Sequence, residues 1–118
     1  MKNVAKEFLL IKRMKEFIVV LEKELVCFPK KDRVLKDRLE EESYRVLELI
    51  YFINYENDRI NDLYCLLSKC KMLDYYLFLS KEKGCISYKR FLYLGRLLRE
   101  IVKMSYGWMK YEKNKDQI

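Results

Sequence analysis

Histidine is absent from this sequence of 118 residues, and the chain holds only one proline and three glycines. Without histidine there is no imidazole for general acid–base catalysis and no mixed Cys/His zinc site. A Glu-x-x-His pair, which builds di-iron sites in helical bundles, is excluded for the same reason. Three scattered glycines also cannot form a glycine-rich phosphate loop. We therefore expect no catalytic residue, no metal and no cofactor, and we predict that the protein is not an enzyme.

Cysteine pairs with the spacing of a metal or redox site are missing as well. The four cysteines are Cys27, Cys65, Cys70 and Cys85, and no two of them form a Cys-x-x-Cys pair. We interpret them as buried structural thiols in a reducing compartment. No run approaches the ~18 apolar residues of a membrane span, and the N-terminus does not resemble a signal peptide. The expected location is the cytoplasm, with no membrane partner.

The scarcity of proline and glycine favours long, uninterrupted helices. Along four segments the apolar residues recur at steps of three and four, which is typical of a helix with one buried face. These segments are Val4–Phe28, Asp32–Tyr55, Ile60–Lys83 and Ser87–Tyr111. We predict an all-α protein with a single domain, residues 1–118. Its expected fold is an up-down-up-down antiparallel four-helix bundle, with a frayed polar tail from about residue 112.

Polar residues, proline and glycine mark the ends of the expected helices. Pro29 has no amide hydrogen and ends the first helix. Asp32 is placed to accept hydrogen bonds from the first free amides of the second helix, and Asn57-Asp58 to cap the third. Gly84 is expected in a left-handed C-terminal cap, with Ser87 as the N-terminal cap of the final helix.

The final segment carries an apolar stripe and a basic stripe. The apolar stripe, which we expect to be core, consists of Phe91, Leu94, Leu98, Ile101, Ser105 and Trp108. The basic stripe consists of Lys89, Arg96, Lys103 and Lys110, with Arg99 between two of them. Seven-residue spacing places cations about 10 Å apart along one helix face. Such a face either contacts the phosphates of a nucleic acid or is a solvated surface, and residue types alone favour neither.

A second basic cluster surrounds the Pro29 turn. It consists of Lys30, Lys31, Arg33, Lys36 and Arg38. In an antiparallel bundle this turn lies near the third connection, where Lys81, Lys83, Lys89 and Arg90 would gather. The formal net charge is +7, and residues 84–118 hold eight Lys or Arg against three Asp or Glu. This convergence of positive charge favours a nucleic-acid surface.

Two glycines inside the final helix indicate packing on a second side. Gly95 and Gly107 each cost about 1 kcal/mol relative to alanine. Close approach of another backbone would explain this cost, and neutral drift is the alternative. We predict an oligomer interface at Gly95, Gly107 and Trp108. The ten tyrosines could stack on bases, but covering a subunit interface is the interpretation that we favour.

The first segment also has more apolar surface than contact with a single helix requires. The residues outside its main apolar seam are Leu9, Leu10, Phe17, Val19 and Val20. This excess indicates a second buried side, which either another helix or another subunit would cover.

Two stretches of the chain resemble a known family. The turn FPKKDR and the following LKDRLEEESYRVLELI resemble the Phe-Pro-Lys-x-(Glu/Asp)-Arg turn and second helix of a family of bacterial four-helix-bundle proteins. That family includes the Avd accessory proteins of diversity-generating retroelements and the proteins encoded in 23S rRNA intervening sequences. The ending ISYKRFLYLGRLLREIVKMSYGWMK is similar to the last helix of Avd, with its serine-led start and its closing Gly-Trp-Met-Lys. The resemblance extends from about Phe8 to Lys110.

The resemblance implies a non-enzymatic subunit that assembles into a basic homopentamer. In the Avd branch such a subunit binds a reverse transcriptase and holds RNA or DNA without sequence specificity, supporting cDNA synthesis. The alternative is an oligomeric scaffold of the rRNA intervening-sequence type, with no specific nucleic-acid role. The resemblance and the two basic clusters together predict a nucleic-acid site at Lys30, Lys31, Arg33, Lys89, Arg96, Arg99, Lys103 and Lys110.

Overall fold

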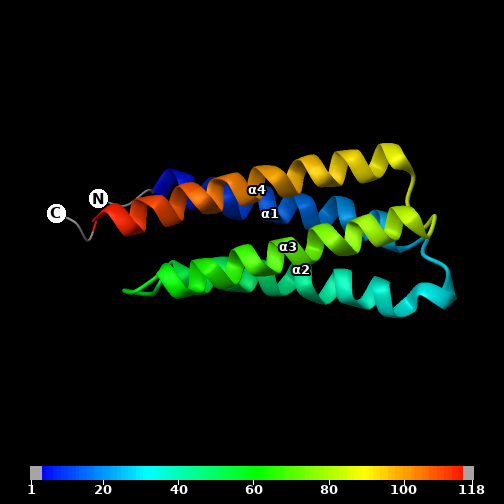
Figure 1. Ribbon diagram of the computed structural model, residues 1–118, viewed down its shortest axis with the longest axis horizontal. Coiled ribbons are helices and arrows are strands. Elements are labelled where there is room, and N and C mark those ends of the chain that lie inside the picture. Colours follow the sequence, from blue (N-terminus) through cyan, green and yellow to red (C-terminus); the bar gives the residue numbers. More distant parts are fainter. Residues whose placement is uncertain (1–3, 116–118) are drawn as a thin grey trace.

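The computed structural model describes residues 4–115, and their side chains from residue 9 onward. Its helices are α1 (Val4–Leu25), α2 (Arg33–Ile53), α3 (Ile60–Glu82) and α4 (Tyr88–Lys115), and a short 3-10 turn, η1 (Lys30–Asp32), precedes α2. The helices lie side by side along a molecule of 52 × 22 × 19 Å (Figure 1). These residues form the helical bundle that the sequence predicts, and they contain no strand.

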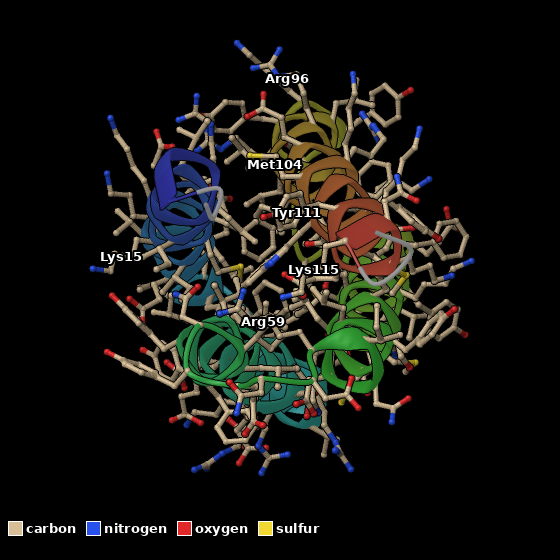
Figure 2. All side chains as sticks on the ribbon, turned by 90° about the vertical axis from the view of Figure 1, so that its left-hand side faces the viewer. Lys15, Arg59, Arg96, Met104, Tyr111 and Lys115 are labelled. Carbon is tan, nitrogen blue, oxygen red and sulfur yellow. The ribbon has the colours of Figure 1, made fainter. Side chains whose placement is uncertain are left out.

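Each helix packs against two others. Helix α1 contacts α2 and α4, and α3 contacts the same two helices. Viewed along the bundle, α1 and α3 therefore occupy diagonally opposite corners (Figure 2). The α1–α2 and α3–α4 connections lie at one end of the molecule, and the α2–α3 connection lies at the other (Figure 1).

One continuous core fills the space between the four helices. Met14, Leu39, Leu73 and Ile101, one from each helix, are fully buried. Burying each such side chain contributes about 1.5–3 kcal/mol. The apolar stripe predicted for α4 is buried from Leu94 to Trp108, with Phe91 partly buried at its start.

Of the apolar residues outside the main seam of α1, some are buried in the bundle and others are exposed. Leu10 and Phe17 are 1% and 0% exposed, so another part of the same chain covers them. Leu9 and Val19 remain exposed, at 37% and 54%. The prediction of a second buried side is thus confirmed for the first pair, because α1 faces both α2 and α4.

Helix α1 ends at Leu25, three residues before the predicted end at Phe28. The amides of Cys27 and Phe28 instead donate to the carbonyls of Glu24 and Leu25, both at 3.1 Å. These bonds form a turn that leads into Pro29. Helix α1 therefore ends before the position at which Pro29 would interrupt it.

The prediction that Asp32 caps α2 is wrong. Asp32 occupies the N-cap position, but its carboxylate makes no capping hydrogen bond. It is 6% exposed and points to the α3–α4 connection. There it accepts a hydrogen bond from the thiol of Cys85 at 3.4 Å and pairs with the Lys83 ammonium at 3.5 Å. Asp32 thus joins two connections that lie at the same end of the bundle.

The α3–α4 connection has the predicted geometry. Gly84 has a φ of +77°, in the left-handed region that favours glycine. The amide of Gly84 donates to the carbonyl of Lys81 at 3.0 Å, and that of Cys85 donates to Ser80 at 2.8 Å. This pair of bonds is the Schellman motif. The Ser87 hydroxyl accepts from the amide of Arg90 at 3.1 Å and so caps α4.

The α2–α3 connection differs from the prediction. The N-cap of α3 is Arg59, without a capping side chain, so Asn57-Asp58 does not cap this helix. Arg59 is 5% exposed, and its guanidinium donates to the carbonyls of Asn54 and Glu56 at 3.0 and 2.9 Å. An arginine therefore satisfies the backbone at the end of α2.

Helix α4 continues beyond the predicted start of the frayed tail. It is helical to Lys115, and Glu112 is only 2% exposed. The Glu112 carboxylate pairs with Arg59 at 3.1 Å and with Lys115 at 2.9 Å. Figure 2 shows Arg59 and Lys115 directed towards the interior of the bundle. The prediction of fraying from residue 112 is wrong because this carboxylate anchors the end of α4, while residues 116–118 lie outside the described part.

Two opposing effects act on the pKa of Glu112. Burial by itself would raise the pKa of this carboxyl. Hydrogen bonds from Lys115 and Arg59 outweigh burial, and they hold the pKa below its ordinary value. Glu112 is therefore an ionised group inside the bundle whose charge is compensated by two cations.

Candidate nucleic-acid interface

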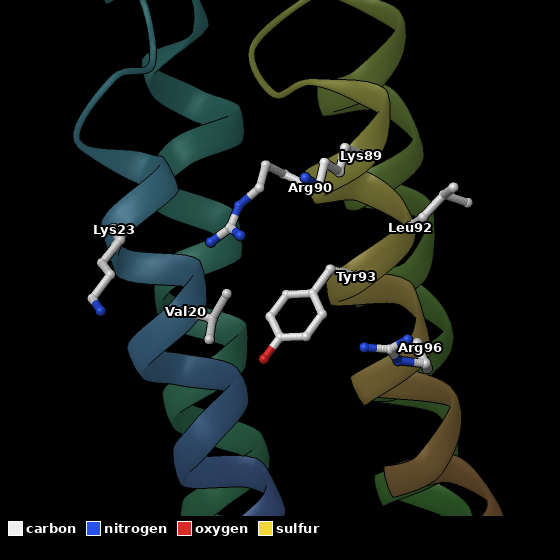
Figure 3. Close-up of a pocket in the computed structure, with 7 residues that line it drawn as sticks. All are labelled: Val20, Lys23, Lys89, Arg90, Leu92, Tyr93 and Arg96. Carbon is white, nitrogen blue, oxygen red and sulfur yellow. The ribbon is translucent and has the colours of Figure 1, made fainter.

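A groove runs between the outer sides of α1 and α4. Its first part has a volume of about 520 Å³ and lies beside the α3–α4 connection (Figure 3). A second part, of about 430 Å³, extends further along α1. Val20 and Tyr93 line both parts, so the two form one surface, which we call the α1/α4 groove. Its other lining residues are Ile11, Lys12, Lys15, Glu16, Val19, Lys23, Lys89, Arg90, Leu92 and Arg96.

Tyr93 lies at the centre of the groove. Its ring projects from α4 towards Val20 of α1 (Figure 3). The guanidinium carbons of Arg90 and Arg96 lie 5.5 and 5.3 Å from the ring centroid, within cation–π range. Arg90 is also paired with Glu24 of α1 at 2.8 Å, which fixes its position. The ring is therefore a partly exposed aromatic surface between two guanidinium groups.

The groove has a strong excess of positive charge. Five of its cations have no ion pair with any residue that the structure describes: Lys12, Lys15, Lys23, Lys89 and Arg96. The nearby acids already have partners, because Glu16 and Glu100 both bind Arg13 at 2.8 and 2.7 Å. Figure 2 shows Lys15 and Arg96 pointing outward, from α1 and α4 respectively. Such cations can contact phosphates while the aromatic ring stacks on a base.

The structure divides the basic stripe predicted for the last helix. Lys89 and Arg96 line the α1/α4 groove, whereas Arg99 lines a separate hollow of about 240 Å³ between α3 and α4. Lys103 and Lys110 are exposed on α4 and line neither part of the groove. On a straight helix, residues seven apart are rotated by about 20° relative to each other. Over the three repeats from Lys89 to Lys110 this rotation accumulates, so the stripe does not stay on one face.

The second basic cluster lies at the end of the bundle where the α1–α2 and α3–α4 connections meet. Lys31, Arg38 and Lys83 line one hollow of about 350 Å³, as the predicted convergence requires. Lys30 is exposed, and Arg33 is exposed and pairs with Asp37 at 3.8 Å. Lys81 makes cation–π contacts within the chain, because its ammonium lies 5.0 Å from the ring centroids of both Phe78 and Phe91.

The α1 side of the groove carries three lysines that the sequence patterns did not predict as site residues. Lys12, Lys15 and Lys23 were not among the predicted site residues, although they line it. Their positions, with Val19 between them, follow helical steps of three and four and mark one face of α1. That signal is visible in the sequence, but pairing this face with Lys89 and Arg96 requires knowledge of which helices are neighbours.

The predicted oligomer interface needs correction at Trp108. Its side chain is 4% exposed and belongs to the core, because it continues the inward stripe of Ile101 and Ser105. Gly95 is also buried, and an added methyl group there would meet the Arg99 guanidinium of the same helix at 3.3 Å. Gly107 is exposed with open space beside it, so its role in an interface stays a prediction.

The prediction that all four cysteines are buried is wrong for two of them. Cys70 and Cys85 are buried, whereas Cys27 and Cys65 are exposed. Burial raises the pKa of the Cys70 thiol to about 12. Across residues 4–115, no three His, Cys, Asp or Glu side chains come together in a way that could hold a metal ion. Within the same part of the chain, no helix combines the length and apolar character of a membrane span.

The fold and the groove define this protein as a helical bundle with a cationic, aromatic-centred groove on one side. Comparisons with protein-family models, with curated proteins and with solved structures find no match to the chain. The resemblance to the Avd family therefore stays an expectation from the sequence motifs, and function is argued from the groove.

Proposed function

We propose that the chain is a non-enzymatic, cytoplasmic accessory protein that binds RNA or DNA through the α1/α4 groove. In this proposal it assembles as a basic homo-oligomer, a pentamer, and supports a reverse transcriptase in the cDNA synthesis of a diversity-generating retroelement. The observation that carries the nucleic-acid part is the set of unpaired cations around Tyr93. The reverse transcriptase and the pentamer rest on the family resemblance alone.

An up-down-up-down, antiparallel connectivity belongs to this proposal. Two ion pairs between α1 and α4 support it, because Arg13 pairs with Glu100 and Glu24 pairs with Arg90. The order of these residues is reversed between the two helices, as it is between antiparallel neighbours. This arrangement places Lys23 of α1 beside Lys89 and Arg96 near the start of α4.

The groove favours binding without sequence specificity. Lys and Arg side chains contact phosphates, which are the same in every sequence, and an aromatic ring can stack on any base. Neutralising several phosphates releases counterions, so affinity should fall steeply with salt. A single strand suits the groove better than a duplex, since only unpaired bases can reach the Tyr93 ring.

A charge-reversal series tests the groove. The groove variant combines Lys23→Glu, Lys89→Glu and Arg96→Glu, and its matched control combines Arg99→Glu, Lys103→Glu and Lys110→Glu. Both variants change the net charge equally, and both keep the wild-type core. Fluorescence anisotropy with labelled single-stranded RNA and DNA, at about 50 and about 200 mM salt, measures the dissociation constants.

The groove variant should bind about 1000-fold more weakly than the wild type, or about tenfold for each lost phosphate contact. The control should lose about tenfold or less, from the general change in charge. Circular dichroism should show equal helicity in all three proteins. Wild-type affinity in the groove variant would exclude the groove as the site, and a larger loss in the control would move the site to the outer face of α4.

The partner enzyme is tested separately. Co-expression with a reverse transcriptase encoded beside this chain should allow the two proteins to be purified together, even in the presence of nuclease. A gene neighbourhood without a reverse transcriptase, combined with an intact oligomer, would favour the scaffold function instead. The observation that favours that second function is a set of exposed apolar and aromatic side chains on α3: Tyr64, Met72, Tyr75 and Phe78.

A further inference from the structure

The hollow between α3 and α4 is separate from the α1/α4 groove. It has a volume of about 240 Å³, and none of its lining residues lines the groove. Its floor consists of side chains that are buried or half-buried: Leu67, Cys70, Leu98 and Val102. Its rim consists of side chains that are exposed: Lys71, Asp74, Arg99 and Tyr106. We call this cavity the α3/α4 hollow.

The floor of the hollow is apolar and neutral. Leu67, Cys70 and Leu98 are 9%, 0% and 1% exposed, so they belong to the core of the bundle. Because burial raises the pKa of the Cys70 thiol to about 12, this thiol stays protonated and acts as a small apolar group. An apolar cavity of about 150 Å³ holds one benzene ring. The α3/α4 hollow therefore has room for a planar system of two fused rings.

The rim carries two cations and one carboxylate whose charges are not compensated within the described part of the chain. Lys71, Asp74 and Arg99 are exposed, and none of them forms an ion pair with any side chain that the structure describes. A ligand that satisfies all three offers an anionic group to the cations and N–H donors to the carboxylate. A nucleotide does so, because it joins a phosphate to a planar base with polar edges.

Guanine is the base that matches this rim. Its Watson–Crick edge presents two neighbouring donors, N1–H and the 2-amino group, and the two oxygens of Asp74 can accept from both. The same edge of adenine has one donor beside a ring nitrogen whose lone pair would face the carboxylate. A pyrimidine has a single ring and would leave part of the floor uncovered. Tyr106 is 54% exposed, so its ring is available to stack on the outer side of the base.

Gly95 determines where the Arg99 guanidinium lies. Gly95 is buried, and a methyl group added there would be 3.3 Å from Arg99 Nη1, which is a tight contact. The guanidinium thus lies against the backbone of its own helix, one turn before Arg99, where glycine leaves it room. Glycine inside a helix is unfavourable, so the position of this cation is a reason for Gly95 that acts within one chain. A guanidinium held in place binds a phosphate at a lower entropic cost than a mobile one.

We propose that the α3/α4 hollow binds a guanine nucleotide, with its base on the apolar floor, its N–H edge on Asp74 and its phosphate on Arg99 and Lys71. The ligand is either the free nucleotide or a guanine nucleotide within a bound strand, because both present the same groups. The inference goes beyond the proposed function, since it adds a base preference that the α1/α4 groove does not have. It also holds whether or not that groove binds nucleic acid.

Isothermal titration calorimetry of the full chain with GMP tests the site, and AMP and inorganic phosphate serve as comparison ligands. AMP should bind at least tenfold more weakly than GMP, and phosphate alone more weakly still. Asp74→Asn should weaken GMP binding at least tenfold and bring the affinities for GMP and AMP close together, because it removes the pair of acceptors that distinguishes them. Arg99→Ala should weaken both nucleotides by a similar factor, because both carry the same phosphate.

Three further variants serve as controls. Glu41→Gln neutralises an exposed acid of α2, and Lys103→Ala removes an exposed cation one turn beyond Arg99. Neither residue lines the hollow, so both variants should bind GMP as the wild type does. The groove variant with three glutamates should keep an at least tenfold preference for GMP over AMP, which separates this site from the proposed function.

Gly95→Ala tests how the cation is positioned. The added methyl group should move the Arg99 guanidinium and so weaken GMP binding. The urea midpoint should not fall, because alanine is the better helix former. A structural role for Gly95 would instead lower both quantities together.

Two oligonucleotides of equal length distinguish the two sources of the ligand. One consists of uridines, and in the other a guanosine replaces every third uridine. If the ligand lies within a strand, the second should bind more tightly in the anisotropy assay, and Asp74→Asn should remove the difference. If it is the free nucleotide, the two should bind alike, and GMP should bind in the presence of either.

Three results would overturn the inference. The first is GMP binding weaker than about 1 mM together with no preference for guanosine in the strand. The second is equal affinity for GMP, AMP and inorganic phosphate. The third is a wild-type preference for guanine in Asp74→Asn.

Discussion

Arginine and lysine side chains have opposite surroundings in the α1/α4 groove and at the α2–α3 end of the bundle. In the groove, Lys23 and Arg96 are exposed and have no ion pair with any described residue. At the bundle end, Arg59 and Glu112 are buried and pair at 3.1 Å. A buried charge must be compensated where it lies, whereas an exposed cation keeps its hydration until a ligand replaces the water. The comparison indicates that the bundle end maintains the fold and that the groove is available for binding.

The largest effect on stability is expected at the bundle end. Glu112→Ala removes a carboxylate that pairs with the buried guanidinium of Arg59, which should lower the free energy of unfolding by about 3–5 kcal/mol. Urea denaturation followed by circular dichroism measures this change. Glu112→Gln, which keeps an acceptor oxygen, should cost less. Equal stability of Glu112→Ala and the wild type would show that this pair does not hold α4 in place.

Acid should weaken the same end of the bundle. Because the pKa of Glu112 is lower in the folded protein than its ordinary value of 4.5, the unfolded chain takes up the proton more readily. The ion pair thus contributes its full stability above about pH 5, and this contribution is lost as pH falls through the folded pKa. The difference in urea midpoint between the wild type and Glu112→Gln should therefore shrink in acid. A difference that stays constant down to about pH 3 would contradict this assignment.

The smallest effect on stability is expected in the groove. Combined Lys23→Ala, Lys89→Ala and Arg96→Ala substitutions remove exposed cations without a described ion pair, and they should change the free energy of unfolding by less than about 0.5 kcal/mol. The same urea experiment serves as the measurement. A large loss of stability would mean that these cations support the fold, and the contrast between the two regions would then disappear.

Local sequence determined the helices, their inward faces and one of their connections. The steps of three and four place Leu39, Leu73 and Ile101 inward, because a side chain's face on a helix depends on its position alone. Gly84 and Ser87 act through bonds to residues no more than four positions away in the chain. Such short-range geometry can be derived from neighbouring residues.

Only the tertiary structure decided which surfaces meet. Asp32 was expected to cap a helix, but its carboxylate contacts Cys85, 53 residues away. Glu112 was expected in a frayed tail, but Arg59, also 53 residues away, lies within reach of its carboxylate. Lys23 and Arg96 share a groove because α1 and α4 are neighbours. Periodicity shows which face of a helix is buried, but it carries no information about which other helix covers that face, and the partners of charged groups depend on that choice.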